Sequence, residues 1–205
     1  MCIMSFFQNT CKPKGFGGNL MVNMMNIGHS SMAEWGFKHI KIHDDDISLD
    51  IGCGGGANIK KILEKSPNGK FVCIYYSEVS VRKSKKINKS AIEIKRCKIL
   101  QSNVQELPFA NETFNLATAF ETIYFWSDID QSFRQIYRVL KKGGVFMICN
   151  ESNGENNKDK KWTEIIKGMK IYTSEQIKYS LEKAGFTHIK VHKNDKGWLC
   201  VVAQR

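Results

Sequence analysis

Short apolar segments alternate with amphipathic segments from about residue 46 to the end of the chain. Runs rich in β-branched and aromatic residues predict strands, and apolar residues three and four positions apart predict helices between them. This alternation is typical of an α/β fold, in which helices cover both faces of a mostly parallel sheet. The first predicted strands are Ile47–Ile51, Lys70–Tyr75, Arg96–Gln101, Phe114–Phe120 and Gly144–Asn150.

Two helices are predicted between these strands. Residues 59–63 carry a short apolar stripe, and Ile129–Leu140 carries a cleaner one at helical spacing. We expect Gly143 and Gly144 to end the second helix, because glycine is common just after a helix. Residues 151–170 are polar and predict a mobile connection.

The C-terminal part predicts one helix and a hairpin. Thr173 and Gln176 have the spacing of a capping box, and the helix that follows is expected to end at Gly185. Two further strands, Phe186–Lys193 and Trp198–Ala203, are separated by a short polar turn. This arrangement predicts an antiparallel hairpin at the edge of the sheet.

The N-terminal segment has a different character. A Met-rich stretch, Leu20–Met25, follows a glycine cluster, and His29–Trp35 has an apolar, helical pattern. Residues 1–40 are therefore interpreted as a helical cap on a single domain formed by residues 41–205.

The net charge of +11 raises the question of a nucleic-acid or membrane partner. Most of the lysines are dispersed, without interleaved aromatic residues, and the densest basic run, Arg82–Lys86, falls in a segment with a helical pattern. A solvated helix face is the favoured interpretation, so neither nucleic acid nor membrane is expected as a partner. The sequence also lacks a secretion signal and a membrane-spanning run, which favours a cytoplasmic protein.

The seven cysteines are an odd number and show no metal-ligand spacing. We expect reduced thiols, several of them buried as small apolar side chains. The histidines other than His29 show no ligand spacing either, and no metal site is predicted; they are His39, His43, His188 and His192.

The strongest chemical signal is a predicted strand that runs into a glycine-rich turn, Gly52–Gly56, and then into a helix. Glycines allow the backbone to pass close to a ligand, and the amide groups at a helix start favour an electronegative group. Gly52, Gly54 and Ala57 also satisfy a dinucleotide-binding fingerprint, so a nucleotide-dependent oxidoreductase is an alternative.

The segment Leu49–Gly56 resembles the first motif of class I S-adenosylmethionine-dependent methyltransferases. Further segments resemble later landmarks of that family in the right order: Leu107–Phe109, Phe114–Ala117 and Tyr137–Gly144. The likeness covers about residues 40–203 and is strongest to the small-molecule branch that includes quinone-biosynthesis enzymes. It implies a Rossmann-like, doubly wound sheet of seven strands with an antiparallel C-terminal hairpin, and S-adenosylmethionine as the methyl donor.

The resemblance also implies roles for the first motif. Gly52, Gly54 and Gly56, with Cys53 among them, would line the methionine and ribose part of the cofactor. Asp50 would support the turn or the amino group of the cofactor.

Two positions depart from the family pattern. Where the family has an acidic residue that receives the ribose hydroxyls, this chain has Tyr75, which offers no bidentate charged acceptor. Glu78, one turn later, is a candidate to compensate. Asn103 replaces an aspartate that accepts from the adenine amino group, and the neighbouring Val104 would offer a backbone N–H to the ring. The expected cofactor contacts are completed by Tyr76 and Phe120.

The segment after the fourth predicted strand, Phe120–Trp126, is rich in aromatic residues and suits the wall of an apolar pocket. Methyl transfer depends mainly on aligning the acceptor with the methyl group, and only some acceptors need a base. The catalytic candidates are His29, Glu121 and Tyr124. A small-molecule methyltransferase is the leading hypothesis, and a degenerate relative that acts as an interaction module is the alternative, because Tyr75 and Asn103 depart from the pattern.

Overall fold

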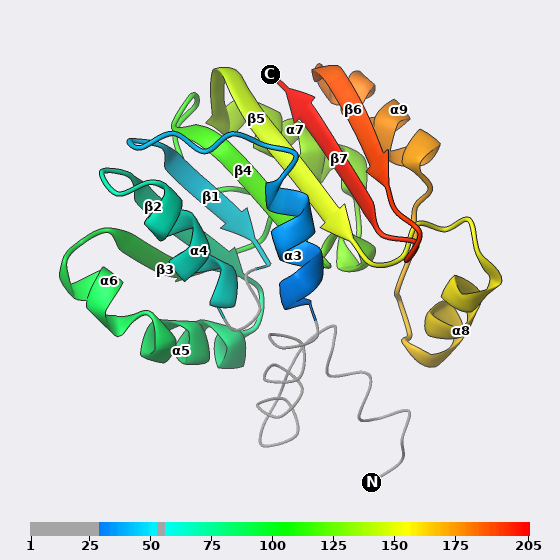
Figure 1. The fold of residues 1–205 in the computed structure, drawn as a ribbon, viewed down its shortest axis with the longest axis horizontal. Helices are drawn as coiled ribbons and strands as arrows, with labels where there is room; N and C mark the ends of the chain where they lie inside the picture. Colours follow the sequence, from blue (N-terminus) through cyan, green and yellow to red (C-terminus); the bar gives the residue numbers. More distant parts are fainter. Residues whose placement is uncertain (1–28, 53–55) are drawn as a thin grey trace, which may run out of the picture.

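The computed structural model describes residues 29–52 and 56–205, which form one seven-stranded sheet with the order β3-β2-β1-β4-β5-β7-β6. All neighbouring strands are parallel except β7, which runs antiparallel to β5 and to β6 (Figure 1). The predicted doubly wound α/β fold with a C-terminal hairpin is confirmed. The strands are β1 (Ile47–Ile51), β2 (Lys70–Tyr75), β3 (Cys97–Gln101), β4 (Phe114–Phe120), β5 (Leu140–Asn150), β6 (Thr187–Lys193) and β7 (Leu199–Gln204).

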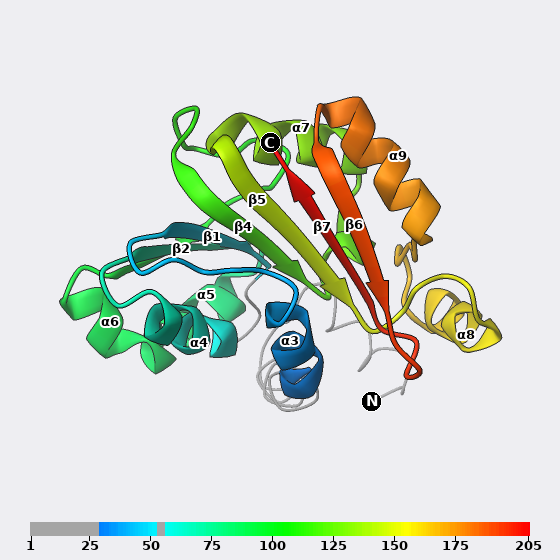
Figure 2. The same cartoon turned by 45° about the horizontal axis from the view of Figure 1, so that its top comes forward.

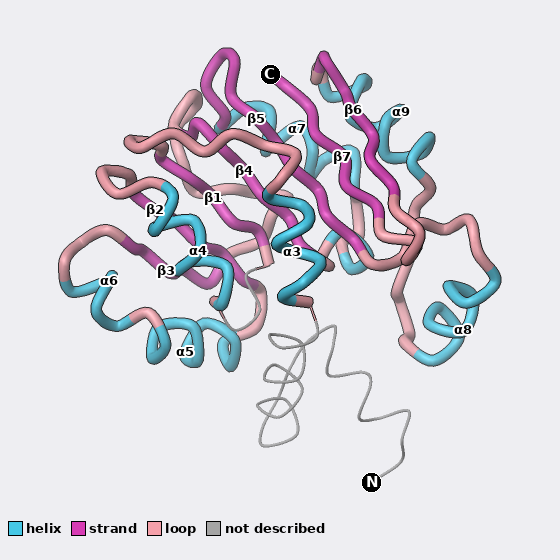
Figure 3. The backbone as a smooth tube through the Cα atoms, viewed as in Figure 1, coloured by secondary structure: helices cyan, strands magenta, loops and turns pink. Residues whose placement is uncertain are grey.

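Helices cover both faces of the sheet, as Figures 1 and 2 show: α3 and α4 lie on one face, and α7 and α9 lie on the other. Figure 3 shows how strands and helices alternate along the middle of the chain. The helices are α3 (Ser30–Phe37), α4 (Ala57–Lys65), α5 (Glu78–Ile87), α6 (Lys89–Glu93), the 3-10 turn η2 (Ile123–Phe125), α7 (Ile129–Val139), α8 (Asn157–Ile165) and α9 (Ser174–Ala184).

Strand β5 divides its side chains between the two faces. Phe146 and Ile148 belong to the core cluster under α7 and α9. Met147 and Cys149 belong to the cluster that includes residues of α3 and α4. Because successive side chains of a strand point to opposite faces, one central strand contributes to both cores.

Most predicted strand boundaries agree with the structure, but the start of β5 does not. Helix α7 ends at Val139, and β5 begins at Leu140, whose backbone is already extended. Gly143 lies inside β5 with φ 77°, and its backbone N–H donates to the carbonyl of Arg205 at 2.8 Å, while the N–H of Arg205 donates to the carbonyl of Gly144 at 2.9 Å. The prediction that these glycines end the helix is wrong, because they form an irregularity within the strand.

The C-terminal helix confirms its sequence signals. The Thr173 side chain accepts from the backbone of Gln176 in a full capping box, and Gly185 ends α9 in the left-handed conformation, with φ 103°. The prediction of a mere connection over residues 151–170 is wrong in part. Helix α8 forms there, with Asn156 as its N-cap.

Helix α3 confirms the helical pattern predicted at residues 29–35, and its buried residues Met32, Ala33 and Phe37 pack on the sheet. The rest of the predicted cap, residues 1–28, lies outside the described residues, so the cap stays a prediction. None of the helices formed by the described residues has the length and apolar character to cross a bilayer.

The prediction of reduced thiols is confirmed for some of the described cysteines and is wrong for one. Cys97, Cys149 and Cys200 are free and buried, as expected. Cys73 is disulfide-bonded, so the expectation of reduced thiols is wrong at that position.

Asp50 is a buried carboxyl in the middle of the sheet. It is 1% exposed, and its neighbour across the strand pair, Thr118 of β4, donates a hydrogen bond of 2.6 Å to Asp50 Oδ1. Burial raises the pKa of Asp50 to about 7, against the smaller opposite effect of the Thr118 hydroxyl. The folded protein therefore favours the protonated form.

We predict that Asp50→Asn stabilises the protein at pH 8 and has little effect at pH 4. The folded pKa of about 7 lies above the unfolded value of 3.8, so ionisation destabilises the wild-type fold as pH rises through this window. The gain at pH 8 should be on the order of 2–4 kcal/mol. Urea unfolding at both pH values measures it, and Thr118→Val is the control that should destabilise at pH 8. Parallel stability curves for wild type and Asp50→Asn would contradict this account.

Candidate active site

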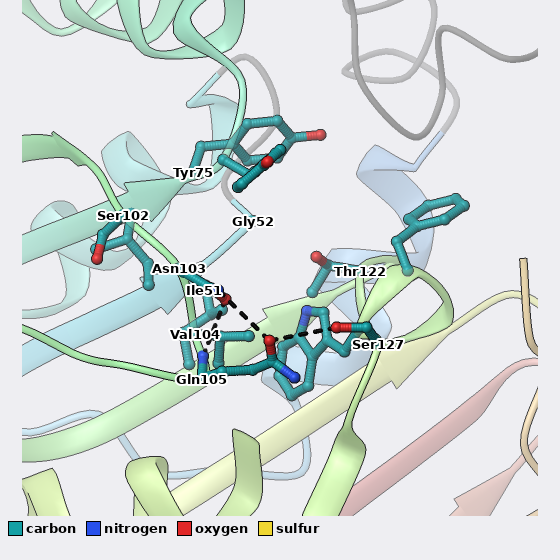
Figure 4. A pocket seen from close by; sticks show the side chains of 13 residues that line it. Ile51, Gly52, Tyr75, Ser102, Asn103, Val104, Gln105, Thr122 and Ser127 are labelled. Carbon is teal, nitrogen blue, oxygen red and sulfur yellow. Dashed lines mark hydrogen bonds between the residues drawn. The ribbon is translucent and has the colours of Figure 1, made fainter. Parts of the chain in front are cut away.

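A pocket of about 260 Å³ lies at the carboxyl ends of β1 to β4. This edge of the sheet, where the strand order reverses between β1 and β4, is where open α/β folds bind ligands. Its volume lies just below the roughly 300–1,000 Å³ typical of ligand pockets. The pocket is shown in Figure 4 and is lined by Ile51, Gly52, Ile74, Tyr75, Tyr76, Ser102, Asn103, Val104, Gln105, Thr122, Phe125, Trp126 and Ser127.

Gly52 forms the start of the turn after β1. Its backbone has φ 87°, and a Cβ atom placed there would lie 2.2 Å from the hydroxyl oxygen of Thr122. Its amide donates to the carbonyl of Ile74 at 2.9 Å, which keeps the turn attached to β2. Only glycine satisfies both the positive φ and the close approach to Thr122.

Gly56 lies against the C-terminal end of α5. It is the N-cap of α4 with φ 80°, and a Cβ atom there would lie 2.3 Å from the Ser84 hydroxyl oxygen and 2.6 Å from the Asn88 amide nitrogen. The Asn88 side chain also donates to the Gly56 carbonyl at 3.2 Å. This glycine therefore allows α4 to start close against α5.

The cofactor candidates fall into three groups. Five of them line the pocket: Gly52, Tyr75, Tyr76, Asn103 and Val104. Three others are not among its lining residues: Asp50 is buried in the sheet, Gly56 packs on α5, and the Phe120 ring packs on Phe37, with centroids 5.1 Å apart. Cys53 and Gly54 lie outside the described residues.

The two positions that depart from the family pattern both face the pocket. Tyr75, at the end of β2, is only 9% exposed. Glu78, the proposed substitute acceptor, is not among the lining residues, and its carboxylate lies 4.0 Å from the Arg82 guanidinium. The side-chain oxygen of Asn103, Oδ1, accepts a hydrogen bond from the backbone N–H of Gln105 at 3.1 Å.

Hydrogen bonds tie the loop after β3 to the loop after β4. The Ser127 hydroxyl donates to the side-chain oxygen of Gln105 at 3.2 Å (Figure 4). The Gln131 side chain donates to the Gln105 backbone carbonyl at the same distance of 3.2 Å. Phe125 and Trp126, predicted as an apolar wall, line the pocket on the β4 side.

The three catalytic candidates lie close together in the structure. Two of them are sequence neighbours of pocket residues: Glu121 precedes Thr122, and Tyr124 precedes Phe125. The Tyr124 hydroxyl lies 3.1 Å from Glu121 Oε1. His29 lies at the start of α3, and its Nδ1 is 3.1 Å from Oε1 of a fourth residue, Glu151, which follows β5. The backbone N–H of Glu151 donates to Glu121 Oε1, which closes the cluster.

The electrostatics of this cluster are unusual. Burial raises the pKa of Glu121 to about 7; the His29 charge opposes this shift and the Glu151 charge adds to it. Burial lowers the pKa of His29, but the Glu151 and Glu121 carboxylates outweigh it, so the pKa lies above its usual value. Burial and the Glu121 charge raise the pKa of Tyr124 well above its usual value. Perturbed groups beside a pocket are typical of functional sites.

Glu151 was missed by sequence reasoning. It comes directly after β5 and is the polar residue that follows a long buried strand. The same position after β4 is held by Glu121, which has a left-handed backbone with φ 54°. Acidic residues directly after two neighbouring parallel strands are the signal that would have found it, since such strands end at one edge of the sheet.

Residues 42–185 match the methyltransferase-domain family. A sterol 4-C-methyltransferase of Caenorhabditis elegans is 27% identical over 180 residues, which are 83% of this chain and 52% of that protein. A demethylmenaquinone methyltransferase of Lactobacillus johnsonii is 27% identical over 139 residues, 66% of this chain and 57% of that protein. The chain thus spans about half the length of these curated relatives.

Solved structures show the same fold. A complex of the Haloferax volcanii Trm112 methyltransferase activator with its methyltransferase-like partner contains a chain with a TM-score of 0.84 and 16% sequence identity. The alignment covers 97% of this chain and 96% of that one. The dinucleotide alternative loses its support, because the family match spans the glycine turn and every strand from β1 to β5. The chain belongs to the methyltransferase-domain family, among the class I S-adenosylmethionine-dependent methyltransferases.

Proposed function

We propose that this protein binds S-adenosylmethionine and transfers its methyl group to a small molecule. The observation that carries the proposal is the pocket at the carboxyl ends of β1 to β4, with Gly52 at its rim. The relatives named above are a sterol and a menaquinone-precursor methyltransferase, both of which have small-molecule acceptors.

The described pocket residues fit a nucleoside. Gly52 presents backbone without a side chain, and its position after β1 suits the methionine and ribose part. The side-chain oxygen of Asn103 has a second lone pair beside the one used by Gln105, so it can accept from an adenine amino group. Val104 and Phe125 supply apolar surface on opposite loops. The bound cofactor would supply the methyl group, and the chain would supply orientation.

On the acceptor side we propose the aromatic wall, Phe125 and Trp126, together with His29, Glu121 and Tyr124. Near-attack alignment of the acceptor is the main requirement for methyl transfer, and a rigid apolar wall with a few polar groups provides it. The role of His29 or Glu121 as a base depends on the acceptor, because only some acceptors lose a proton.

We also propose that nucleic acid is not a partner. Four basic side chains pair with a glutamate one turn away on the same helix. These pairs are Lys60 with Glu64, Arg82 with Glu78, Lys89 with Glu93, and Lys178 with Glu182. A cytoplasmic location is proposed as well; the free thiols of Cys97, Cys149 and Cys200 support it, and the disulfide at Cys73 is the observation against it.

One observation favours a second candidate, a protein of this fold with weak cofactor binding that serves as an interaction module. By its resemblance to the family, Tyr75 corresponds to the position of the ribose-binding carboxylate; it lines the pocket, whereas Glu78 does not. Losing a charge-assisted hydrogen bond costs on the order of 1.5–3 kcal/mol. The two candidates therefore differ in affinity for the cofactor.

We predict that calorimetric titration shows one S-adenosylmethionine site per chain, and that the demethylated product binds there too. NAD, which shares the adenosine but carries a pyrophosphate in place of the methionine, should bind roughly 100-fold more weakly or not at all, because the proposed site receives the methionine part at the glycine turn. If neither S-adenosylmethionine nor its demethylated product gives a binding signal, the result would favour the interaction module.

We predict that Tyr75→Asp tightens S-adenosylmethionine binding by roughly tenfold to a hundredfold, since a carboxylate can receive both ribose hydroxyls. Tyr76→Asp, at the next pocket-lining position, is the matched control for added charge and should have a smaller effect. Tyr75→Phe separates the ring from its hydroxyl. An unchanged or lower affinity in Tyr75→Asp would mean that the tyrosine itself serves the ribose.

A further inference from the structure

Three side chains from separate parts of the chain meet at the edge of the sheet beside the pocket. His29 precedes α3, Glu121 follows β4 and Glu151 follows β5. One ligand atom from each, the imidazole nitrogen and two carboxylate oxygens, lies within 4.8 Å of the other two. These are atom types that bind divalent cations.

The charges of this cluster are not balanced by its described neighbours. Two carboxylates meet there, and within residues 29–52 and 56–205 the only basic side chain in ion-pair contact with either of them is His29. One imidazole can neutralise one carboxylate at most. Two buried or half-buried carboxylates beside one another are costly unless one of them takes up a proton, which the raised pKa of Glu121 allows, or a further positive charge joins them.

The imidazole nitrogen has one close polar neighbour among the described residues. His29 Nδ1 is buried and lies 3.1 Å from Glu151 Oε1, which is an ion-pair contact, but it makes no hydrogen bond of good geometry with any residue in 29–52 and 56–205. A buried nitrogen of this kind calls for an explanation, and an ion between it and the two carboxylates is one.

Tyr124 holds the carboxylate side of the cluster in place. Its hydroxyl is 3.1 Å from Glu121 Oε1 and accepts from the backbone N–H of Ser152 at 3.0 Å. The phenol thus links the segment after β4 to the segment after β5. Hydrogen bonds that orient ligating carboxylates are a regular feature of metal sites.

We propose that His29, Glu121 and Glu151 form a binding site for one divalent transition-metal cation, such as Mn²⁺, Fe²⁺, Co²⁺ or Zn²⁺. An imidazole with two carboxylates suits these ions, whereas Ca²⁺ and Mg²⁺ prefer oxygen ligands alone. Bond lengths of about 2.0–2.2 Å would place ligand atoms roughly 3–3.5 Å apart, so binding requires a small inward rotation of the side chains.

The site shares His29 and Glu121 with the proposed acceptor side, but none of its three ligands lines the proposed cofactor pocket, so cation binding and S-adenosylmethionine binding can be tested separately. The cluster adjoins the pocket through Thr122 and Phe125, the sequence neighbours of Glu121 and Tyr124. A bound cation would place a positive charge next to the proposed acceptor side.

The test is a titration of the full-length, untagged chain with Mn²⁺ after treatment with a chelator. Binding is measured by electron paramagnetic resonance as the decrease in the signal of free Mn²⁺. Mn²⁺ is chosen because it prefers nitrogen and oxygen to the thiols of the free cysteines. We expect one site per chain. Glu121→Gln and Glu151→Gln should each weaken binding more than roughly tenfold, and Tyr124→Phe by about 10–100-fold.

Glu34→Gln is the matched control, since Glu34 lies on α3 and pairs with Lys61 on the surface, 2.9 Å away. It should leave Mn²⁺ affinity unchanged. Circular dichroism checks that each variant folds. If Glu121→Gln or Glu151→Gln does not fold, Tyr124→Phe is the variant whose Mn²⁺ affinity tests the proposal. Absence of stoichiometric Mn²⁺ binding in the wild type, or equal affinity in the Glu121→Gln and Glu34→Gln variants, would overturn the proposal. Failure to bind S-adenosylmethionine would leave it standing.

Discussion

The contact between Gly52 and Thr122 is the constraint on which the rest of the site depends. These residues follow β1 and β4, which are neighbours in the sheet, and they approach so closely that no Cβ atom fits at Gly52. The turn after β1 therefore lies against the loop after β4, and the pocket opens between them and the ends of β2 and β3. A side chain at Gly52 would separate the two loops and change the whole rim.

Buried or half-buried acidic groups lie both within the sheet and at its carboxyl edge. Within the sheet, Asp50 relies on a single hydroxyl from Thr118. Beyond the strand ends, Glu121 and Glu151 share their surroundings with His29 and Tyr124. Burial destabilises each of these charges, and the fold retains them only where a neighbouring strand supplies a partner. Such retained charges are more typical of a working site than of a stabilising core.

Most of the fold could be predicted from local pattern. Strands β1, β2 and β4 have the predicted boundaries, because each is a compact apolar run bounded by polar or glycine residues. The capping box at Thr173 and the glycine at 185 also mark the ends of α9, since both signals act within a few residues. The start of β5 could not be predicted in this way. Its first residues are extended because they pair with Phe114 and with the C-terminal Arg205, which are distant in sequence.

By itself the sequence determined the fold class, the glycine turn and the family, because these depend on residue types at short, ordered spacings. It also indicated Tyr75 and Asn103 as departures that face the pocket. Only the tertiary structure decided which charged residues act together. Glu151 lies 30 positions from Glu121, and no local pattern connects them. Parallel strands end at a common edge whatever the length of chain between them, and that geometry brings both carboxylates to His29.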